Sequence, residues 1–314
     1  MRYVFLGSPP FATPVLAHLI EDDWRPELVV TPPARPRGRG RQLVASPVAS
    51  LAEEAGIPVL QPASVRDEAF LEDLRAVEAD VFLVVSYGEL LRQSFLDLPR
   101  DVALNIHPSL LPRHRGATPV QTAILSGDER TGVSIQKMVL ELDAGDVLCA
   151  RETDVLPDET SGELFDRLAV LSGELAAEAL RLVADGNAVY RPQDEDSVTF
   201  CKKLSKEDGW IDWSRSAVEL DRHVRGMNPW PLAATQLPNG ERLAVHRAQV
   251  LPVAGEERAP GSVLVAKDRL VVACGEGTLE LLQVQAAGKR AMTASDYLRG
   301  ARIAPGDVLG GPEQ

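Results

Sequence analysis

The chain has few of the residues that would place it in a secreted, membrane or metal-binding class. Only three cysteines occur in 314 residues, and they lie far apart without a CxxC pair: Cys149, Cys201 and Cys274. This usage argues against a disulfide framework and a thiolate zinc site, and it fits a reducing compartment. No apolar run approaches the roughly 18 residues of a membrane span, and the run near the N-terminus is too short for a signal peptide. We therefore expect a cytoplasmic protein without a membrane partner.

Positive charge is also scarce. The 33 lysine and arginine residues are outnumbered by 46 aspartate and glutamate residues, which leaves a formal net charge of -13. An acidic chain of this kind does not bind nucleic acid indiscriminately. The window 28–52 is the exception, because it has no acidic residue and contains RPRGRGRQ. Its arginines, Arg35, Arg37, Arg39 and Arg41, predict a local site for an anionic partner; the alternative is a solvated surface loop.

The length of the chain exceeds what one hydrophobic core usually supports, so we expect two domains. The first part alternates short apolar strands, such as RYVFLG, DVFLVVSYG and VALNIH, with segments of helical periodicity. SPVASLAEEAG, for example, has a Ser cap, a Pro in the first turn and a terminal Gly. This alternation predicts an α/β fold with a Rossmann-like, doubly wound parallel sheet. After the second strand we expect a loop to about residue 46.

The composition and the periodicity of the sequence change after residue 186. Segment 187–206 is polar and lacks periodicity, so it is the expected linker. Beyond it, a helix in SRSAVELDRHVRGM is followed by short alternating segments separated by Gly, Pro and Asn. These predict a smaller antiparallel sandwich or barrel at 207–314, and we expect an OB-like β-barrel. Three tryptophans are expected in its core: Trp210, Trp213 and Trp230.

The segment NIHPSLLPRHRG contains the first candidates for chemistry. Residues two apart on a strand face the same side, so Asn105 and His107 should project together. Ligands of open α/β sheets bind at the carboxyl ends of the strands. An amide donor beside an imidazole suits a reaction in which a carbonyl oxygen gains charge while a proton moves. The pair could equally cap a strand end, and the two residues alone do not decide between these interpretations.

A carboxylate for the same site could come from LELDAGDVL. Asp143 and Asp146 lie there in a Gly-containing turn beside the apolar strand VSIQKMVL. A carboxylate at this place would orient His107 and raise its pKa, or receive a proton through water. Acidic residues in turns are often only turn formers, and spacing alone does not select Asp143.

NIHPSLLPRHRGATP and TGVSIQKMVLELDAGDVL together resemble the folate-dependent formyltransferase superfamily. Its Asn-x-His, SLLP segment and following Asp are matched in order and spacing by Asn105, His107, Ser109–Pro112 and Asp143. Within the superfamily the chain resembles the methionyl-tRNA formyltransferases along nearly its whole length, through segments such as KLSKEDGWIDW, MNPWP and AAGKRAM. One departure is Pro108, which stands where the family often has Gly.

The resemblance implies an enzyme that transfers the formyl group of 10-formyltetrahydrofolate to the α-amino group of methionine on initiator methionyl-tRNA. Asn105 would stabilise the oxyanion, His107 would handle the proton, and Asp143 would hold His107 and a relaying water. No metal is needed. The alternatives are a formyltransferase for a small-molecule amine, a formyltetrahydrofolate hydrolase and a non-catalytic RNA-binding protein.

The resemblance also assigns parts of the chain to ligands. Residues 1–186 would form the formyl-folate-binding catalytic domain, 187–206 the linker and 207–314 the tRNA-binding β-domain of a monomer. The expected folate contacts are Ser86, Tyr87, Gly88, Glu89, Leu90, Ser109, Leu110, Leu111, Pro112, Val139, Leu140, Glu141 and Leu142. The expected tRNA contacts are the loop residues Arg35, Arg37, Arg39 and Arg41, with Arg39 in the key position, and the basic residues Lys202, Lys203, Lys206, Lys289 and Arg290.

Overall fold

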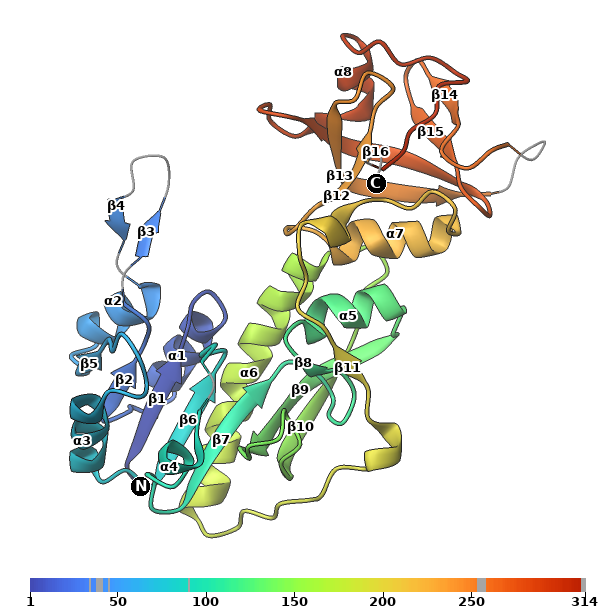
Figure 1. Cartoon of the computed structure of the whole chain (residues 1–314). Coiled ribbons are helices and arrows are strands. Elements are labelled where there is room, and N and C mark those ends of the chain that lie inside the picture. The colour runs from blue at the N-terminus through green and yellow to red at the C-terminus, as the bar shows by residue number, and fades with distance from the viewer. Residues whose placement is uncertain (34, 38–41, 45, 90, 253–257, 312–314) are drawn as a thin grey trace. The chain divides into compact units, whose positions relative to one another are not determined.

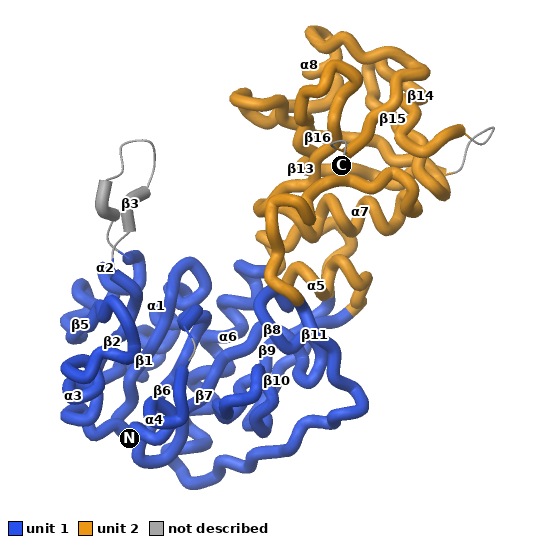
Figure 2. The backbone as a smooth tube through the Cα atoms, in the orientation of Figure 1, with its two compact units in different colours: residues 1–119, 130–154, 165–201 blue, residues 120–129, 155–164, 202–314 orange. Residues whose placement is uncertain are grey.

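The structure is a computed structural model that describes residues 1–33, 35–37, 42–44, 46–89, 91–252 and 258–311 (Figure 1). The chain folds as two compact units, shown in different colours in Figure 2. The N-terminal unit comprises residues 1–119, 130–154 and 165–201, and the C-terminal unit comprises residues 120–129, 155–164 and 202–314. Segments 120–129 and 155–164 thus belong to the C-terminal unit, although they interrupt the N-terminal unit in the sequence.

A seven-stranded sheet with the order β10-β9-β7-β6-β1-β2-β5 forms the centre of the N-terminal unit. The strands β5, β2, β1, β6 and β7 are parallel, whereas β9 and β10 are antiparallel to their neighbours. The bounds are β1 (Tyr3–Gly7), β2 (Leu28–Val30), β5 (Val59–Leu60), β6 (Val81–Val85), β7 (Val102–His107), β9 (Arg130–Lys137) and β10 (Val147–Asp154). The Rossmann-like α/β prediction is confirmed, and the antiparallel edge is an addition to it.

Helices cover both faces of this sheet, which explains why β1 and β6 are buried along their whole length. On one face, Val4 and Leu6 of β1 pack in a cluster with Leu71 and Leu74 of α3. On the other face lie α1, α2 and α6 (Figure 1), and Phe11 makes an edge contact with Phe165. The bounds are α1 (Ala12–Glu21), α2 (Pro47–Glu54), α3 (Glu68–Val77), α4 (Gln93–Leu96) and α6 (Ser161–Ala184).

The region expected to be a loop up to residue 46 contains regular structure. Strand β3 (Arg35–Arg37) pairs antiparallel with β4 (Gln42–Val44). The prediction of a loop without strands is therefore wrong for these residues. Pro36 weakened the strand signal, but both strands of a two-stranded ladder are edge strands, where proline is tolerated.

The first part of the expected linker is joined to the N-terminal unit. Arg191 and Val147 exchange main-chain hydrogen bonds of 2.8 and 2.9 Å. Further on, β11 (Phe200–Cys201) pairs in parallel with β8 (Arg115–Gly116). A side chain on Gly116 would collide with the carbonyl of Cys201, and its φ of +122° also favours glycine. This close approach fixes the segment as far as Cys201.

The C-terminal unit is built on a six-stranded antiparallel sheet, in which five strands follow the order β12-β13-β16-β15-β14 and the sixth, β17, pairs with β16. Residues 307–310 close this sheet, since Gln236 and Gly310 exchange main-chain hydrogen bonds and Val263 donates to Asp307. The result is the predicted small barrel. Its elements are β12 (Ala233–Gln236), β13 (Arg242–Leu251), β14 (Val263–Ala266), β15 (Leu270–Ala273), β16 (Thr278–Ala286), β17 (Met292–Thr293), α5 (Pro119–Ser126), α7 (Ala217–Gly226) and α8 (Ala294–Leu298).

The core of the C-terminal unit contains the apolar face of the barrel together with α7. Helix α7 begins at a capping box formed by Ser216 and Glu219. Trp213 is buried, and its Nε1 donates to Thr235 Oγ1 at 3.0 Å. Trp230, however, is 50% exposed, so its assignment to the core is wrong.

No helix in the described part of the chain is long and apolar enough to span a bilayer.

Candidate active site

Asn105 and His107 occupy the carboxyl end of β7, where the sheet changes from parallel to antiparallel. Their register partners on β9 are Gln136 and Ser134, which also lie two residues apart. Alternation along both strands therefore places these four polar side chains on one face. His107 is buried, and Asn105 is partly accessible. The expected pairing of Asn105 with His107 is thus present in the fold.

Asp143 reaches the same place from the loop between β9 and β10. Its Oδ2 lies 3.7 Å from His107 Nδ1 and accepts from the main-chain N–H of Gly116 at 2.9 Å. Its Oδ1 accepts from Gln136 Nε2 at 3.1 Å. The residue has a φ of +50°, a conformation that aspartate tolerates better than most residues. The loop then returns closely over β9, where a side chain on Gly145 would collide with the carbonyl of Lys137.

The protonation of His107 follows from its two nitrogen contacts. Nε2 lies 2.9 Å from the carbonyl oxygen of His114, and since a carbonyl only accepts, Nε2 carries a hydrogen and donates it. Burial lowers the pKa of His107 below its ordinary 6.5, although the nearby Asp143 charge opposes this shift. The ring is therefore neutral at pH 7, with its unprotonated Nδ1 facing Asp143. Proton uptake at Nδ1 would place the new charge beside a carboxylate.

The site opens into a small hollow beside the Asp143 loop. Its lining includes Asn105, Gln136, Val139, Glu141 and Asp143. The loop exposes apolar side chains around it, since Val139, Leu140 and Leu142 are 41%, 61% and 58% exposed. A ligand with a flat apolar part would cover side chains that are otherwise in water.

The other expected folate contacts fall into two groups. In the turn after β6, Ser86 and Gly88 have positive φ, and the buried Tyr87 hydroxyl has no hydrogen-bond partner. Burial and, to a lesser degree, the charge of Glu89 raise the pKa of Tyr87 well above its ordinary value. Leu90 lies outside the described residues.

In the turn after β7, the polar groups of Ser109 make hydrogen bonds within the protein. Its hydroxyl donates to the carbonyl of Arg113 at 2.6 Å, and its own carbonyl accepts from Ser134 Oγ at 2.8 Å. The main-chain N–H of Leu111 also donates to Ser134 Oγ, at 3.0 Å. Leu110, Leu111 and Pro112 are partly accessible. A ligand would therefore meet these residues before it could meet the Ser109 side chain.

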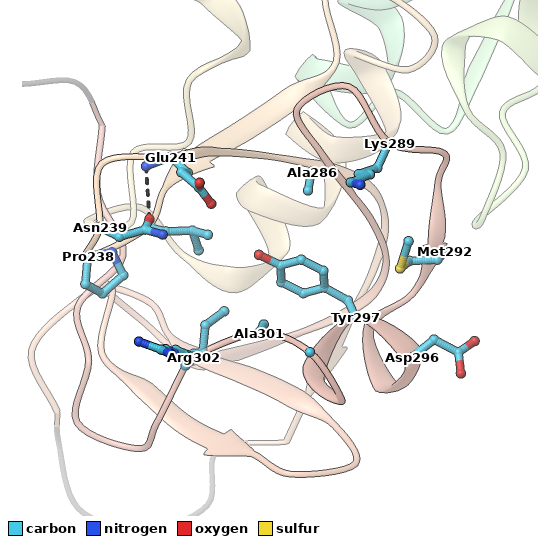
Figure 3. Close-up of a pocket in the computed structure, with 13 residues that line it drawn as sticks. Pro238, Asn239, Glu241, Ala286, Lys289, Met292, Asp296, Tyr297, Ala301 and Arg302 are labelled. Atoms are coloured by element: carbon cyan, nitrogen blue, oxygen red, sulfur yellow. Dashed lines mark hydrogen bonds between the residues drawn. The ribbon is translucent and has the colours of Figure 1, made fainter.

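The expected tRNA contacts are dispersed. Arg35 and Arg37 lie in β3, whereas Arg39 and Arg41 lie outside the described residues. Lys202 pairs with Asp208 at 2.5 Å, and Lys203, Lys206 and Arg290 are exposed. Lys289 lines a cavity of about 560 Å³ on the C-terminal barrel, together with Tyr297 and Arg302 (Figure 3).

Four residues of the site were missed in the sequence: Arg115, Gln136, Gln193 and Glu195. Gln136 could have been found, because it alternates with Ser134 across the apolar Val133 and Ile135. Gln193 and Glu195 carried no such signal, since they lie in a polar segment without periodicity. Arg115 was one of several basic residues in its segment, yet its side chain is only 1% exposed.

Within the described residues, no group of three His, Cys, Asp or Glu side chains is arranged to hold a metal ion. The described cysteines are unpaired. The site consists of an amide, an imidazole and a carboxylate at the end of a Rossmann-like sheet. Such a set can polarise a carbonyl group and move a proton.

This fold and this site define a formyltransferase. A family model described as "Formyl transferase" matches residues 1–180, and one described as "Formyl transferase, C-terminal domain" matches residues 203–302. Relatives named methionyl-tRNA formyltransferase align over almost the whole chain. The protein of Paramagnetospirillum magneticum is 45% identical over 99% of this chain and 100% of its own, and that of Agathobacter rectalis is 40% identical over 98% and 99%. The chain belongs to the methionyl-tRNA formyltransferase family and is a transferase.

Solved structures share the fold at low sequence identity. An N-formyltransferase from Helicobacter canadensis, in complex with folinic acid and dTDP-3-aminofucose, has a TM-score of 0.68 and 14% identity over 91% of this chain and 99% of its own. HypX from Aquifex aeolicus, in complex with tetrahydrofolic acid, has a TM-score of 0.63 and 19% identity over 95% of this chain. The chain spans about half of HypX, 47% of its length.

Proposed function

We propose that the protein transfers the formyl group of 10-formyltetrahydrofolate to the α-amino group of methionine on initiator methionyl-tRNA. The observation that carries this proposal is the approach of Asp143 to His107, at 3.7 Å, beside Asn105 at the end of β7. Relatives with that name align along both units of the chain. Cytoplasmic location and a monomeric state remain expectations of the sequence.

The three side chains have separate tasks in this reaction. The co-substrate supplies a formyl carbon to which the amine nitrogen becomes bonded, while the bond from that carbon to N10 breaks. Asn105 donates a hydrogen bond to the formyl oxygen as that oxygen gains negative charge. His107 accepts the amine proton at Nδ1, directly or through water, and Asp143 stabilises the charge that results. The proton then passes to N10, which completes the balance.

Residues around the hollow fit a folate co-substrate. The exposed Leu140 and Leu142 offer apolar surface to a flat ring system. The unpartnered hydroxyl of Tyr87 is a buried polar atom in the neighbouring turn. Positive φ at Ser86 and Gly88 turns that main chain sharply, so that its polar groups can serve as ligands. We assign this surface to the pterin and its linker.

The arginines of the 35–42 segment and the basic residues of the barrel suit a tRNA substrate. Four arginines without an acidic residue form a positively charged insertion on an acidic chain. In the cavity of Figure 3, Lys289 and Arg302 flank the ring of Tyr297, and neither cation pairs with another side chain of the described ranges. Cations around an aromatic ring are typical of contacts with phosphates and unstacked bases.

Incubation with 10-formyltetrahydrofolate and methionyl-initiator tRNA is expected to yield formyl-methionine, which mass spectrometry of the hydrolysed aminoacyl bond detects. Uncharged initiator tRNA should yield none, and a methionyl-elongator tRNA should react far more slowly. A nucleotide-linked amino sugar tests the small-molecule alternative in the same assay. Formylation of the sugar in preference to the tRNA would contradict the proposal.

Arg39→Ala is expected to lower kcat/KM for charged initiator tRNA about tenfold, which corresponds to about 1.4 kcal/mol. The reason is the loss of one cation at the acceptor end, so folate affinity should not change. Replacing Arg35, Arg37, Arg39 and Arg41 with serine should also reduce discrimination against elongator tRNA. Arg181→Ala, an exposed arginine on α6, is the matched control. Normal discrimination by the four-serine variant would exclude these arginines from tRNA selection.

A further inference from the structure

The amide of Gln193 links two parts of the N-terminal unit. Its Nε2 donates to the main-chain oxygens of Asp143 at 2.8 Å and Gly145 at 2.7 Å, and it lies 3.2 Å from Gln136 Oε1. Its Oε1 accepts from Arg115 Nε at 3.0 Å and Nη2 at 2.9 Å. Every polar atom of this side chain is therefore engaged, with the Asp143 loop on one side and Arg115 on the other.

Arg115 donates two hydrogen bonds to the amide oxygen of Gln193 and thereby fixes its orientation. Its side chain is 1% exposed, which is rare for a charged residue and requires compensation. The compensation comes from Gln193 and from Glu195, whose carboxylate accepts from Nη2 at 2.7 Å and from Nη1 at 3.4 Å. The planar guanidinium fixes both partners at once, because its donors point in set directions.

The other hydrogen bonds of Asp143 come from the Gly116 N–H and Gln136 Nε2 to its carboxylate, whereas Gln193 contacts the main chain of the loop. Leu140 and Leu142 are exposed, so burial of apolar surface contributes little to its position. Asp143 itself adopts a left-handed φ of +50°, a conformation that most residues adopt rarely and aspartate more readily. Gln193 donates one hydrogen bond to the main-chain carbonyl of Asp143 and one to that of Gly145. These two bonds hold the first and the last residue of the segment 143–145.

We propose that Gln193, held by Arg115 and Glu195, is a positioning residue that keeps the Asp143 carboxylate against His107 during formyl transfer. The inference rests on the proposed function and deepens it. It assigns a role in the reaction to a segment that the sequence presents as a polar linker. Gln193 does not touch the reacting atoms, and it acts through the main chain of the Asp143 loop.

Gln193→Met in the full chain tests this role, since methionine keeps the length of the side chain and removes its donor without adding charge. We expect kcat for methionyl-tRNA to fall about 10- to 100-fold, because a misplacement of about 1 Å in an active site can cost about 10²-fold. The KM values should change little. The NMR titration of the His107 ring should move to lower pH, because Asp143 raises the pKa of His107 and would lie farther from it.

Arg151→Ala is the matched control. It removes contacts of 2.8 and 2.7 Å to Glu174 and Glu178 in the same unit, away from the loop. Its kcat and its His107 titration should equal those of the unchanged protein. Glu195→Ala is a second variant that creates no cavity, because Glu195 is 69% exposed. It should change both readouts in the same direction as Gln193→Met, by a smaller amount.

The proposal is overturned if Gln193→Met keeps the original kcat, or if its kcat falls in step with its Tm while the His107 titration stays in place. The second result would describe a residue that only stabilises the fold. Absence of formyl transfer by the unchanged protein would instead contradict the proposed function. The titration needs no substrate, so it reports on the role of Gln193 in either case.

Discussion

Replacing Asn105 with alanine is expected to lower kcat for formyl transfer by about 10²- to 10³-fold, which is the typical effect of losing one oxyanion donor. The amide lies at the end of β7 beside His107, and its position on the hollow leaves it accessible to a substrate. A carbonyl oxygen placed there gains negative charge only as the amine attacks. The loss should therefore appear in kcat, with tRNA and folate affinities close to those of the unchanged protein. Single-turnover formylation at saturating concentrations of both substrates measures it.

The control for this variant is Asn187→Ala, which truncates an exposed asparagine after α6 in the same unit. It should have the original kcat and the original Tm. An Asn105→Ala protein with full activity would remove the amide from the mechanism. If its Tm and kcat fell together, Asn105 would instead be a structural cap of the strand end, as the sequence alone allowed.

The parts of the site that depend on the two-residue periodicity of a strand could be predicted from the sequence. Asn105 and His107 are two apart on a strand, and the pleat places them on one side of the sheet wherever the strand runs. The same rule would have found Gln136. The alternation of strands and helices likewise predicts a covered sheet. The alternation predicts parallel strands, but no helix separates β9 from β10, so it does not cover these two antiparallel strands.

The remaining parts depend on contacts between distant residues. Gln193 meets Asp143 across 50 residues of chain, and no local pattern marks such a pair. Spacing in the sequence does not select Asp143 over Asp146. The position of each carboxylate relative to His107 depends on the path of the folded loop. Only the folded loop brings one of them within 3.7 Å of His107. The sequence likewise does not predict that residues 307–310 close the barrel, since these residues show no alternation of apolar and polar side chains.

The difference between the two aspartates gives the second large effect. Asp143→Asn should lower kcat by about 10²-fold or more, within the usual range for a general acid–base pair. The asparagine can still accept from Gly116, so the loop should keep its fold. What is lost is the negative charge that would face a protonated His107. Asp146→Asn makes the same change of charge three residues later, and it should retain most of the activity.

The acid limb of the rate profile separates an electrostatic role of Asp143 from a structural one. His107 must be neutral to accept a proton at Nδ1, so activity should fall as pH drops through its pKa, which burial places below 6.5. Asp143 favours the protonated ring and thereby raises this pKa, so removing its charge should move the acid limb to lower pH. Asp146→Asn should leave the limb in place. A limb that stays in place for Asp143→Asn, or moves to higher pH, would show that the carboxylate does not act on the imidazole.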